Sequence, residues 1–87
     1  NNYEQGYVRF KLNNLDEALT FMNLSLEQSL ETDDVISQAC SYRGLGEIYL
    51  ALEDREISNR HFKRALELFE SAGEFEGVKE IEELINR

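Results

Sequence analysis

The feature that most constrains the fold of this chain is its similarity to itself when it is shifted by forty residues. Small, apolar and turn-forming positions of the two copies coincide, in phase with the spacing of a helix face. The superposed pairs are Gly6 with Gly46, Val8 with Ile48, Leu12 with Leu52, Asn14 with Asp54, Ala18 with Ser58, Met22 with Phe62, Ser25 with Ala65, and Leu26 with Leu66. An internal repeat of this length is typical of a solenoid, in which each unit packs on its neighbours.

The second copy indicates what the repeated unit is. One set of residues falls at i, i+3, i+4 and i+7 and so shares one face of a helix: Tyr42, Leu45, Gly46 and Tyr49. A second stripe with helical spacing follows: Ser58, Phe62, Ala65 and Phe69. Glycine inside a helix costs about 1 kcal/mol relative to alanine, so Gly46 needs a packing reason. We therefore predict a hairpin of two helices that lie closest at Gly46.

Polar turn residues divide the chain into five predicted helices, over about residues 2–12, 15–31, 34–52, 55–72 and 74–87. Asn13 and Asn14 break the first helix, because asparagine tolerates left-handed geometry and caps helices well. Asn14 followed by Glu17 is a variant of the capping box, and Asp54 is the predicted cap of the fourth helix. Gly73 is a natural C-terminal stop for that helix.

Two of these helices carry apolar stripes that predict their buried sides. In the second helix the stripe consists of Leu15, Ala18, Leu19, Met22, Leu26 and Leu30. In the last helix it consists of Phe75, Val78, Ile81, Leu84 and Ile85. The opposite face of the last helix is acidic, so this helix either caps the stack or begins a third repeat. Its offset from the third helix fits thirty-nine or forty residues about equally.

The predicted fold class is all-α, an α-solenoid of antiparallel helix-turn-helix repeats with about five helices. We expect a single domain over residues 1–87. Its first repeat covers about 1–32, its second about 33–72, and the capping or third-repeat helix 74–87. The chain has no proline and five glycines, so no flexible linker divides it.

The net charge of −9, from nine basic and eighteen acidic residues, bears on the partners of the chain. A phosphate backbone or an anionic membrane is repelled, whereas a basic or amphipathic peptide is attracted. The alternative is that the acidity only keeps the chain soluble. No apolar run approaches the roughly 20 residues of a membrane span, and no signal peptide is visible. The missing initiator Met suggests a segment of a longer protein. The lone Cys40 cannot form an internal disulfide, so a reduced, cytoplasmic setting is expected.

The order of residues in the second copy resembles the tetratricopeptide repeat, a helix-turn-helix unit. The residues that carry the resemblance are Tyr42, Leu45, Gly46, Tyr49, Ser58, Phe62 and Ala65. The first copy keeps Gly6 and Ala18 but has Arg9 where a tyrosine is usual, and Glu53 replaces the usual turn glycine. The period is about forty residues rather than the common thirty-four. Similar long-period units occur in bacterial peptide-sensing regulators and in kinesin light chain.

The resemblance implies a concave groove, lined by the first helix of each pair, that binds a peptide or a partner protein. Carried over to this chain, the groove residues are Tyr3, Tyr7, Phe10, Lys11, Arg43, Glu47 and Leu50. Three exposed aromatic side chains on one helix are expected to be covered by something. The alternatives are a partner, a missing upstream repeat, a second copy of the chain, or no covering group at all. Tyr3 and Tyr7 replace the Lys and Asn with which some family members grip a terminal carboxylate, so recognition of chaperone tails is not expected.

Other candidate sites have simpler explanations. His61 has no partner at ligand or catalytic spacing and is expected at a boundary, and Cys40 is expected to be inert. The basic residues Arg60 and Lys63 are explained by pairing with Glu56 and Glu67 four residues away, with Arg64 beside them on the solvated face. A solvated helix face likewise explains the acidic residues of the last helix, Glu80, Glu82 and Glu83.

The sequence therefore predicts no catalytic residue, no metal site and no cofactor. The predicted function is that of a non-enzymatic protein-interaction module or scaffold. The alternative is a structural or self-associating segment, possible as a homodimer, of a larger multi-repeat protein such as a peptide-sensing regulator.

Overall fold

The computed structural model of the chain describes residues 1–86, all of whose regular structure is helical. The five helices are α1 (Asn2–Lys11), α2 (Leu15–Thr32), α3 (Val35–Ala51), α4 (Arg55–Ser71) and α5 (Phe75–Ile85). The predicted all-α fold with five helices is thus confirmed, and the predicted helix starts lie within one residue of the observed ones. Arg87, at the end of the last predicted helix, lies outside the described residues.

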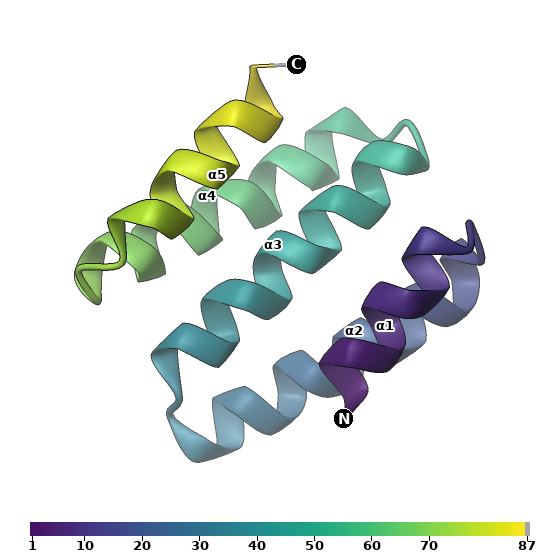
Figure 1. Cartoon of the computed structure of the whole chain (residues 1–87), viewed down its shortest axis with the longest axis horizontal. Coiled ribbons are helices and arrows are strands. Elements are labelled where there is room, and N and C mark those ends of the chain that lie inside the picture. The colour runs from purple at the N-terminus through teal and green to yellow at the C-terminus, as the bar shows by residue number, and fades with distance from the viewer. Residues whose placement is uncertain (87) are drawn as a thin grey trace.

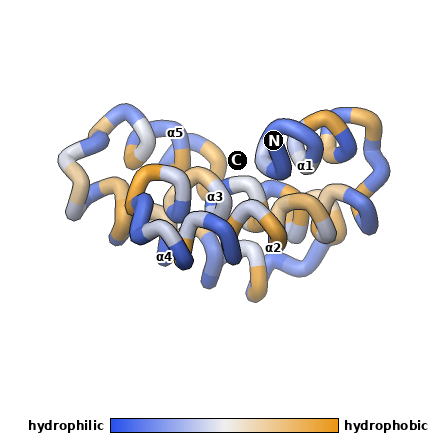
Figure 2. The backbone as a smooth tube through the Cα atoms, turned by 90° about the horizontal axis from the view of Figure 1, so that it is seen from below, coloured by the Kyte–Doolittle hydropathy of each residue, from blue (hydrophilic) through white to orange (hydrophobic). Residues whose placement is uncertain are grey.

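The helices form two layers (Figure 1). α1, α3 and α5 run in the same direction in the front layer, and α2 and α4 run in the opposite direction behind them. In Figure 2, α1 and α5 stand on either side of α3, on the side away from α2 and α4. Each front helix packs on the rear helix that follows or precedes it in the chain, which is the arrangement of a stack of antiparallel hairpins.

The corners between helices recur every twenty residues. Each contains a residue with positive φ: Asn13 (62°), Asp33 (55°), Glu53 (64°) and Gly73 (72°). The next residue in each case is the N-cap of the following helix: Asn14, Asp34, Asp54 and Glu74. α5 therefore begins forty residues after α3, which resolves the register that the sequence left open.

Side-chain caps occur at two of these corners. The carboxylates of Asp34 and Asp54 accept hydrogen bonds from the backbone N–H groups of Ser37 and Ile57, at 3.1 and 3.2 Å. The predicted cap at Asp54 is confirmed.

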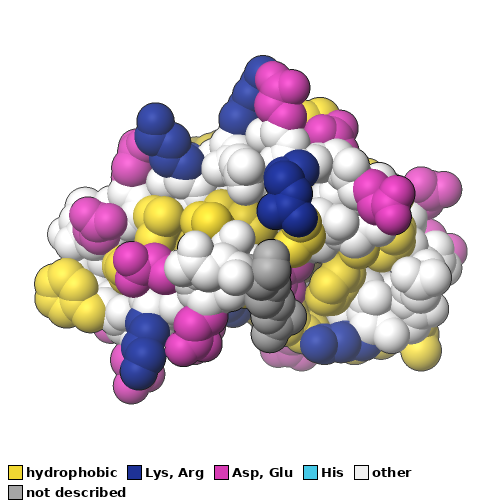
Figure 3. Space-filling model, turned by 90° about the horizontal axis from the view of Figure 1, so that it is seen from above, with side chains coloured by type: hydrophobic (Ala, Val, Ile, Leu, Met, Phe, Trp, Pro, Cys, Tyr) yellow, Lys and Arg dark blue, Asp and Glu magenta, His cyan; other side chains and the backbone are white. Residues whose placement is uncertain are grey.

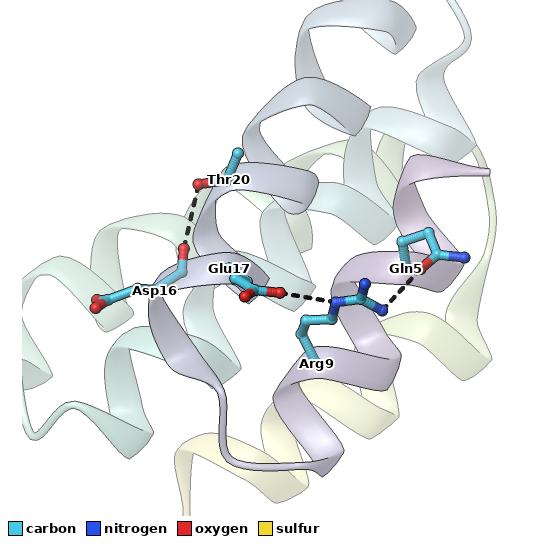
Figure 4. A network of polar contacts seen from close by, with 5 residues as sticks. All are labelled: Gln5, Arg9, Asp16, Glu17 and Thr20. Carbon is cyan, nitrogen blue, oxygen red and sulfur yellow. Dashed lines mark hydrogen bonds and ion pairs between the residues drawn. The ribbon is translucent and has the colours of Figure 1, made fainter.

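The predicted capping box at Asn14 and Glu17 is wrong, because the Asn14 side chain makes no capping hydrogen bond. The Glu17 carboxylate instead accepts from Nε of Arg9 on α1, at 3.1 Å (Figure 4). A guanidinium forms a stronger, charge-assisted bond than a backbone N–H does. The pairing of Glu17 thus joins α1 to α2 instead of closing the first turn of α2.

The core consists of two apolar clusters on either side of α3. One contains Ala18, Met22, Leu45 and Ile48, and the other contains Ala39, Phe62, Ala65, Leu68, Phe69 and Ile81. α3 and α4 approach closely at Gly46, where an added Cβ would lie 2.6 Å from the Phe62 ring. The Ser58 hydroxyl donates to the Gly46 carbonyl at 2.7 Å, which satisfies a buried polar side chain at that contact.

Two residues of the predicted apolar stripes are exposed. Leu30 is 49% exposed, and the neighbouring Ser29 is buried in its place, where its carbonyl accepts from the Gln38 amide of α3. Phe75 is 69% exposed because it is the first residue of α5, ahead of the turn in which Gly77 meets Phe69. Apolar spacing predicts which face of a helix is buried. It does not predict over which part of the helix a neighbouring helix packs on that face.

Candidate partner-binding groove

Five of the seven groove residues predicted from the sequence line one hollow between α1, α3 and α5. This hollow, called the groove below, has a volume of about 350 Å³ and is lined by Tyr7, Phe10, Lys11, Glu47, Leu50, Ala51 and Leu84. Figure 3 views the molecule from the end at which α1, α3 and α5 finish, and hydrophobic side chains form a band there between charged ones. The walls of the groove therefore come from α1, α3 and α5, three successive helices of the front layer.

The aromatic side chains of α1 form a continuous row, of which Tyr7 and Phe10 line the groove. The ring centroids of Tyr3 and Tyr7 lie 6.1 Å apart, and those of Tyr7 and Phe10 lie 5.9 Å apart in an edge-to-face arrangement. Lys11 Nζ lies 5.2 Å from the centroid of Tyr7 and 5.7 Å from that of Phe10, within cation–π range. These three rings are half-buried rather than exposed, because Tyr3 and Phe10 also pack against the cluster around Met22.

Burial raises the pKa of both phenols of this row. It raises the pKa of the Tyr7 hydroxyl, and the nearby Glu47 carboxylate raises that pKa further. Burial likewise raises the pKa of Tyr3, although the adjacent Arg43 guanidinium opposes the shift. Neutral phenols can each donate one hydrogen bond, so the row combines an apolar surface with polar edges.

Arg43 lies beside the groove but does not line it. One amino group of its guanidinium donates to the Tyr3 hydroxyl oxygen on α1 at 2.9 Å, and the other forms an ion pair with Glu80 on α5. The Arg43 side chain is only 17% exposed. The sequence identified Arg43 as a contact for the partner, which stays a prediction. In the fold both amino groups of its guanidinium contact neighbouring helices. The sequence analysis also placed Glu80 on a solvated face and missed its pairing with Arg43.

The sequence analysis missed two residues of the groove lining, Ala51 and Leu84. Leu84 is the one that comes from another helix, α5. It belongs to the apolar stripe predicted for the last helix, but nothing in the sequence indicates that α5 approaches Phe10 and Leu50. The forty-residue register, which places α5 in the same position relative to α4 as α3 has relative to α2, supplies that information.

A second cavity, of about 310 Å³, was not predicted. It is lined mainly by polar side chains: Asn1, Asn2, Tyr3, Ser25, Gln28, Ser29, Thr32, Ser37 and Cys40. In the second hairpin the corresponding space is filled by the N-terminal half of α3, whose Ala39 is buried with Ala65, Leu68 and Phe69. Ala65, Leu68 and Phe69 are the counterparts of Ser25, Gln28 and Ser29, which line the polar cavity. The cavity therefore corresponds to the space that α3 fills in the second hairpin.

Most residues that carry the family signature lie between the two helices of a hairpin, whereas Leu45 and Tyr49 also pack against the cluster around Met22, between the hairpins. Gly6, Ala18, Leu45, Gly46, Ser58, Phe62 and Ala65 are buried. Tyr42 and Tyr49 are half-buried and both stack on His61, with ring centroids 5.9 and 5.5 Å apart. Burial lowers the pKa of His61.

The other residues considered from sequence have structural surroundings. Burial raises the pKa of the half-buried Cys40 thiol. Glu56 pairs with Arg60 at 2.9 Å as predicted, but Glu67 pairs with Arg64, at 3.2 Å, and not with Lys63. Within residues 1–86, no group of three or more His, Cys, Asp or Glu is placed to hold a metal ion.

None of the helices in the described part of the chain is both long and apolar enough to cross a lipid bilayer. Comparison with known families gives one match, to a model described as tetratricopeptide repeat, over residues 1–71. The match covers α1 to α4 and ends at the last residue of α4. Neither the curated proteins nor the solved structures gave a match. Because the family model covers more than half of the chain and the fold agrees with it, the chain belongs to the tetratricopeptide repeat family.

Proposed function

We propose that the chain is a non-enzymatic interaction module that binds a peptide or partner protein in the groove between α1, α3 and α5. Tetratricopeptide repeats generally mediate contacts between proteins and are typically not enzymes. The observation that carries the proposal is the convergence of Tyr7, Phe10 and Leu50 with Leu84 around one cavity of about 350 Å³. Aromatic and aliphatic side chains around a hollow are typical anchors of protein interfaces.

The lining of the groove favours an apolar side chain as the anchor of the partner. Half-buried rings keep part of their surface wet in the free protein, and covering it gains roughly 25 cal/mol per Å². The Lys11 ammonium lies within cation–π range of the Tyr7 and Phe10 rings, so it places a positive charge beside the apolar side chains of the groove. Glu47 contributes to the groove from α3.

The charge of the chain favours a partner whose anchor is flanked by basic residues. The net charge of −9 attracts a cationic peptide at long range, whereas the groove itself contains both a cation, Lys11, and an anion, Glu47. We therefore propose an amphipathic peptide with an apolar face and basic flanks. The same charge disfavours nucleic acid and anionic membranes. A cytoplasmic setting stays a prediction of the sequence.

The forty-residue register supports α5 as a cap that closes the stack formed by a first repeat over about 1–32 and a second over about 33–72. In α3, the residues that pack against α4 include Ala39, Tyr42 and Gly46. Their counterparts in α5 are Lys79, Glu82 and Asn86, which are polar and exposed. A face of this kind suits solvent rather than a following helix, which favours a cap over a third repeat.

Self-association is the second candidate, and one observation favours it. Val8, 48% exposed, is the counterpart of Ile48, which is fully buried in the cluster with Ala18 and Met22 of α2. Leu12, 73% exposed, extends the same outward side of α1. A helix from a second copy would cover this surface as α2 covers Ile48. Sedimentation at increasing concentration, with Val8→Ser as the comparison, tests this candidate.

Selection from a displayed library of random peptides on the full chain tests the groove. We expect enrichment of peptides that combine aliphatic or aromatic residues with Lys and Arg, and loss of their binding in the Tyr7→Ala, Phe10→Ala double variant. Phe75→Ala is the matched control, since Phe75 is exposed on α5 and does not line the groove. Helical circular dichroism establishes that each variant is folded. Selected peptides that bind the double variant as well as the wild type would rule out the groove as their site.

A further inference from the structure

The three helices that form the groove are held mainly from behind. α1 packs on α2, α3 packs on α2 and α4, and α5 packs on α4, whereas α1 and α3 touch each other only slightly. Their separation on the groove side therefore depends on side chains that reach across the front layer. Hairpins stacked in this way change curvature by small rotations between units.

Arg43 reaches across the front layer in both directions. From the middle of α3, its guanidinium contacts Tyr3 on α1 and Glu80 on α5 at the same time. The ion pairs Arg60–Glu56 and Arg64–Glu67 lie within α4, and Arg9–Glu17 lies within the first hairpin. The contacts of Arg43 thus join three successive units.

The two acceptors of Arg43 lie one helical turn from residues that line the groove. Tyr3 precedes Tyr7 by four residues on α1, with the ring centroids 6.1 Å apart, and Glu80 precedes Leu84 by four residues on α5. Contacts that hold Tyr3 and Glu80 in place therefore also hold the parts of α1 and α5 that carry Tyr7 and Leu84.

The chemistry of arginine suits this role. Its planar guanidinium presents donors in a rigid fork and is charged at every pH of interest, so two acceptors in different directions are held together. Lysine offers a point charge on a flexible stem and cannot reproduce the fork. With a side chain only 17% exposed, Arg43 also retains little surface for a partner.

We propose that Arg43 is a positioning residue that ties α1 to α5 across α3 and thereby sets the width of the groove. Its importance for binding rests on the proposed function, but the tie itself exists without a partner. The partner then meets a preorganised hollow, and little of the binding energy is used to bring the walls together.

Distances between spin labels on α1 and α5 test the tie directly. In a Cys40→Ser background, labels at Val8→Cys and Glu83→Cys report the separation of the two helices at exposed positions. We expect a narrow distance distribution in the wild type, and a wider one shifted to longer separations in Arg43→Gln and Arg43→Lys. Arg60→Gln, which removes an exposed pair within α4, is the matched control and leaves the distribution unchanged.

Two milder variants keep the test decisive if Arg43→Gln loses its helical signal. Tyr3→Phe removes only the acceptor on α1, and Glu80→Gln removes only the charge on α5. Either one widens the distribution if Arg43 is a tie. Distributions identical to the wild type in all folded variants would overturn the proposal.

The two proposals can fail separately. If the selected peptides ignore Tyr7→Ala with Phe10→Ala but the label distances respond to Arg43→Gln, the tie stands and the groove assignment falls. If the peptides need Tyr7 and Phe10 but the label distances do not change, the groove stands and the tie falls.

Discussion

The guanidinium of Arg9 lies 5.1 Å from the centroid of the Phe21 ring, in the place that Tyr49 and His61 take forty residues later. The rings of Tyr49 and His61 lie 5.5 Å apart and nearly parallel. Both pairs thus place a flat group of the first helix on a ring of the second. The first repeat departs from the family tyrosine at Arg9 but keeps the contact.

The surroundings of the two pairs explain the change of residue. Tyr49 packs against the cluster around Met22, between the hairpins. Arg9 instead stands on the outward side of the first hairpin, where it also binds Glu17 and Gln5, at 3.1 and 2.8 Å (Figure 4). An arginine can place its guanidinium on a ring and still donate several hydrogen bonds from the edge of that group. A tyrosine has only one hydroxyl for this purpose.

Removing Arg9 should weaken the first hairpin. Arg9→Ala loses a cation–π contact worth about 0.5–1 kcal/mol and a part-exposed ion pair worth about 0–1 kcal/mol, so we expect a loss of about 1 kcal/mol. Urea unfolding, followed by circular dichroism, measures this loss in the free energy of unfolding. Arg60→Ala, whose ion pair is exposed and lies within one helix, should change the free energy by less than about 0.5 kcal/mol. Equal effects of the two substitutions would contradict a special role for Arg9.

The repeated fold could be predicted from the sequence because its signals are local. Helical spacing, Asn13–Asn14 and Glu53–Asp54 determine where helices begin and end, and the forty-residue shift determines that they pair. Leu30 was misplaced because a stripe of leucines does not indicate where the packed neighbour ends. The register of α5 relative to α3 could be determined only from the positions of the corners in the folded chain.

The groove was only partly predictable, for a physical reason. Tyr7, Phe10 and Leu50 follow from their stripe on the first helix of each pair, which the family resemblance makes the inner side. The contacts of Arg43 depend instead on residues 40 and 37 positions away, on helices that meet only in the folded chain. Sequence spacing identified the residue but not its partners.

The corner at Glu53 offers a stabilising substitution. A non-glycine residue in the left-handed region costs roughly 1–2 kcal/mol. Glycine avoids this cost in the folded chain, but its greater conformational freedom in the unfolded chain offsets part of the gain. Because Glu53 has φ of 64°, we expect Glu53→Gly to stabilise the fold by about 0.5–1 kcal/mol. Thermal unfolding measures the change.

The reverse substitution at the next equivalent corner is its control. Gly73 has φ of 72° and open space around an added Cβ, so Gly73→Ala changes the backbone preference alone and should destabilise by about 1 kcal/mol. Asn13→Gly should have a smaller effect than Glu53→Gly, since asparagine tolerates this geometry. A destabilised Glu53→Gly would show that its side chain matters more than its backbone.

The close approach of α3 and α4 should make Gly46 intolerant of a side chain. An added Cβ would lie 2.6 Å from the Phe62 ring, which is fully buried and cannot turn aside, so Gly46→Ala should destabilise by about 2–3 kcal/mol. Gly6→Ala is the matched comparison. Its Cβ would lie 3.1 Å from the flexible end of Met22 and 3.2 Å from the Met22 backbone nitrogen, both farther than the 2.6 Å approach at Gly46, so it should cost less. Urea unfolding measures both variants.

A double variant separates crowding from the propensity of glycine. Combined with Phe62→Leu, the Gly46→Ala change should cost less than it does alone, because the smaller side chain leaves space for the new methyl group. If the effects of the two substitutions simply add, the ring of Phe62 is not what excludes the methyl group.

The stacking of His61 between Tyr42 and Tyr49 should make stability depend on pH near neutrality. Burial lowers the pKa of His61 in the folded chain below the ordinary value of 6.5, so the unfolded chain binds the proton more readily. The contribution of His61 is therefore complete above pH 6.5 and is lost as the pH falls through that value and on through the lowered pKa of the folded chain. Urea midpoints between pH 7.5 and pH 5.5, a range above the titration of ordinary carboxylates, should fall for the wild type. His61→Phe keeps an aromatic ring between the tyrosines but cannot titrate, so its midpoint should fall less over the same range. A wild type and a variant with parallel pH profiles would mean that both tyrosine rings stabilise the imidazolium enough to cancel its desolvation.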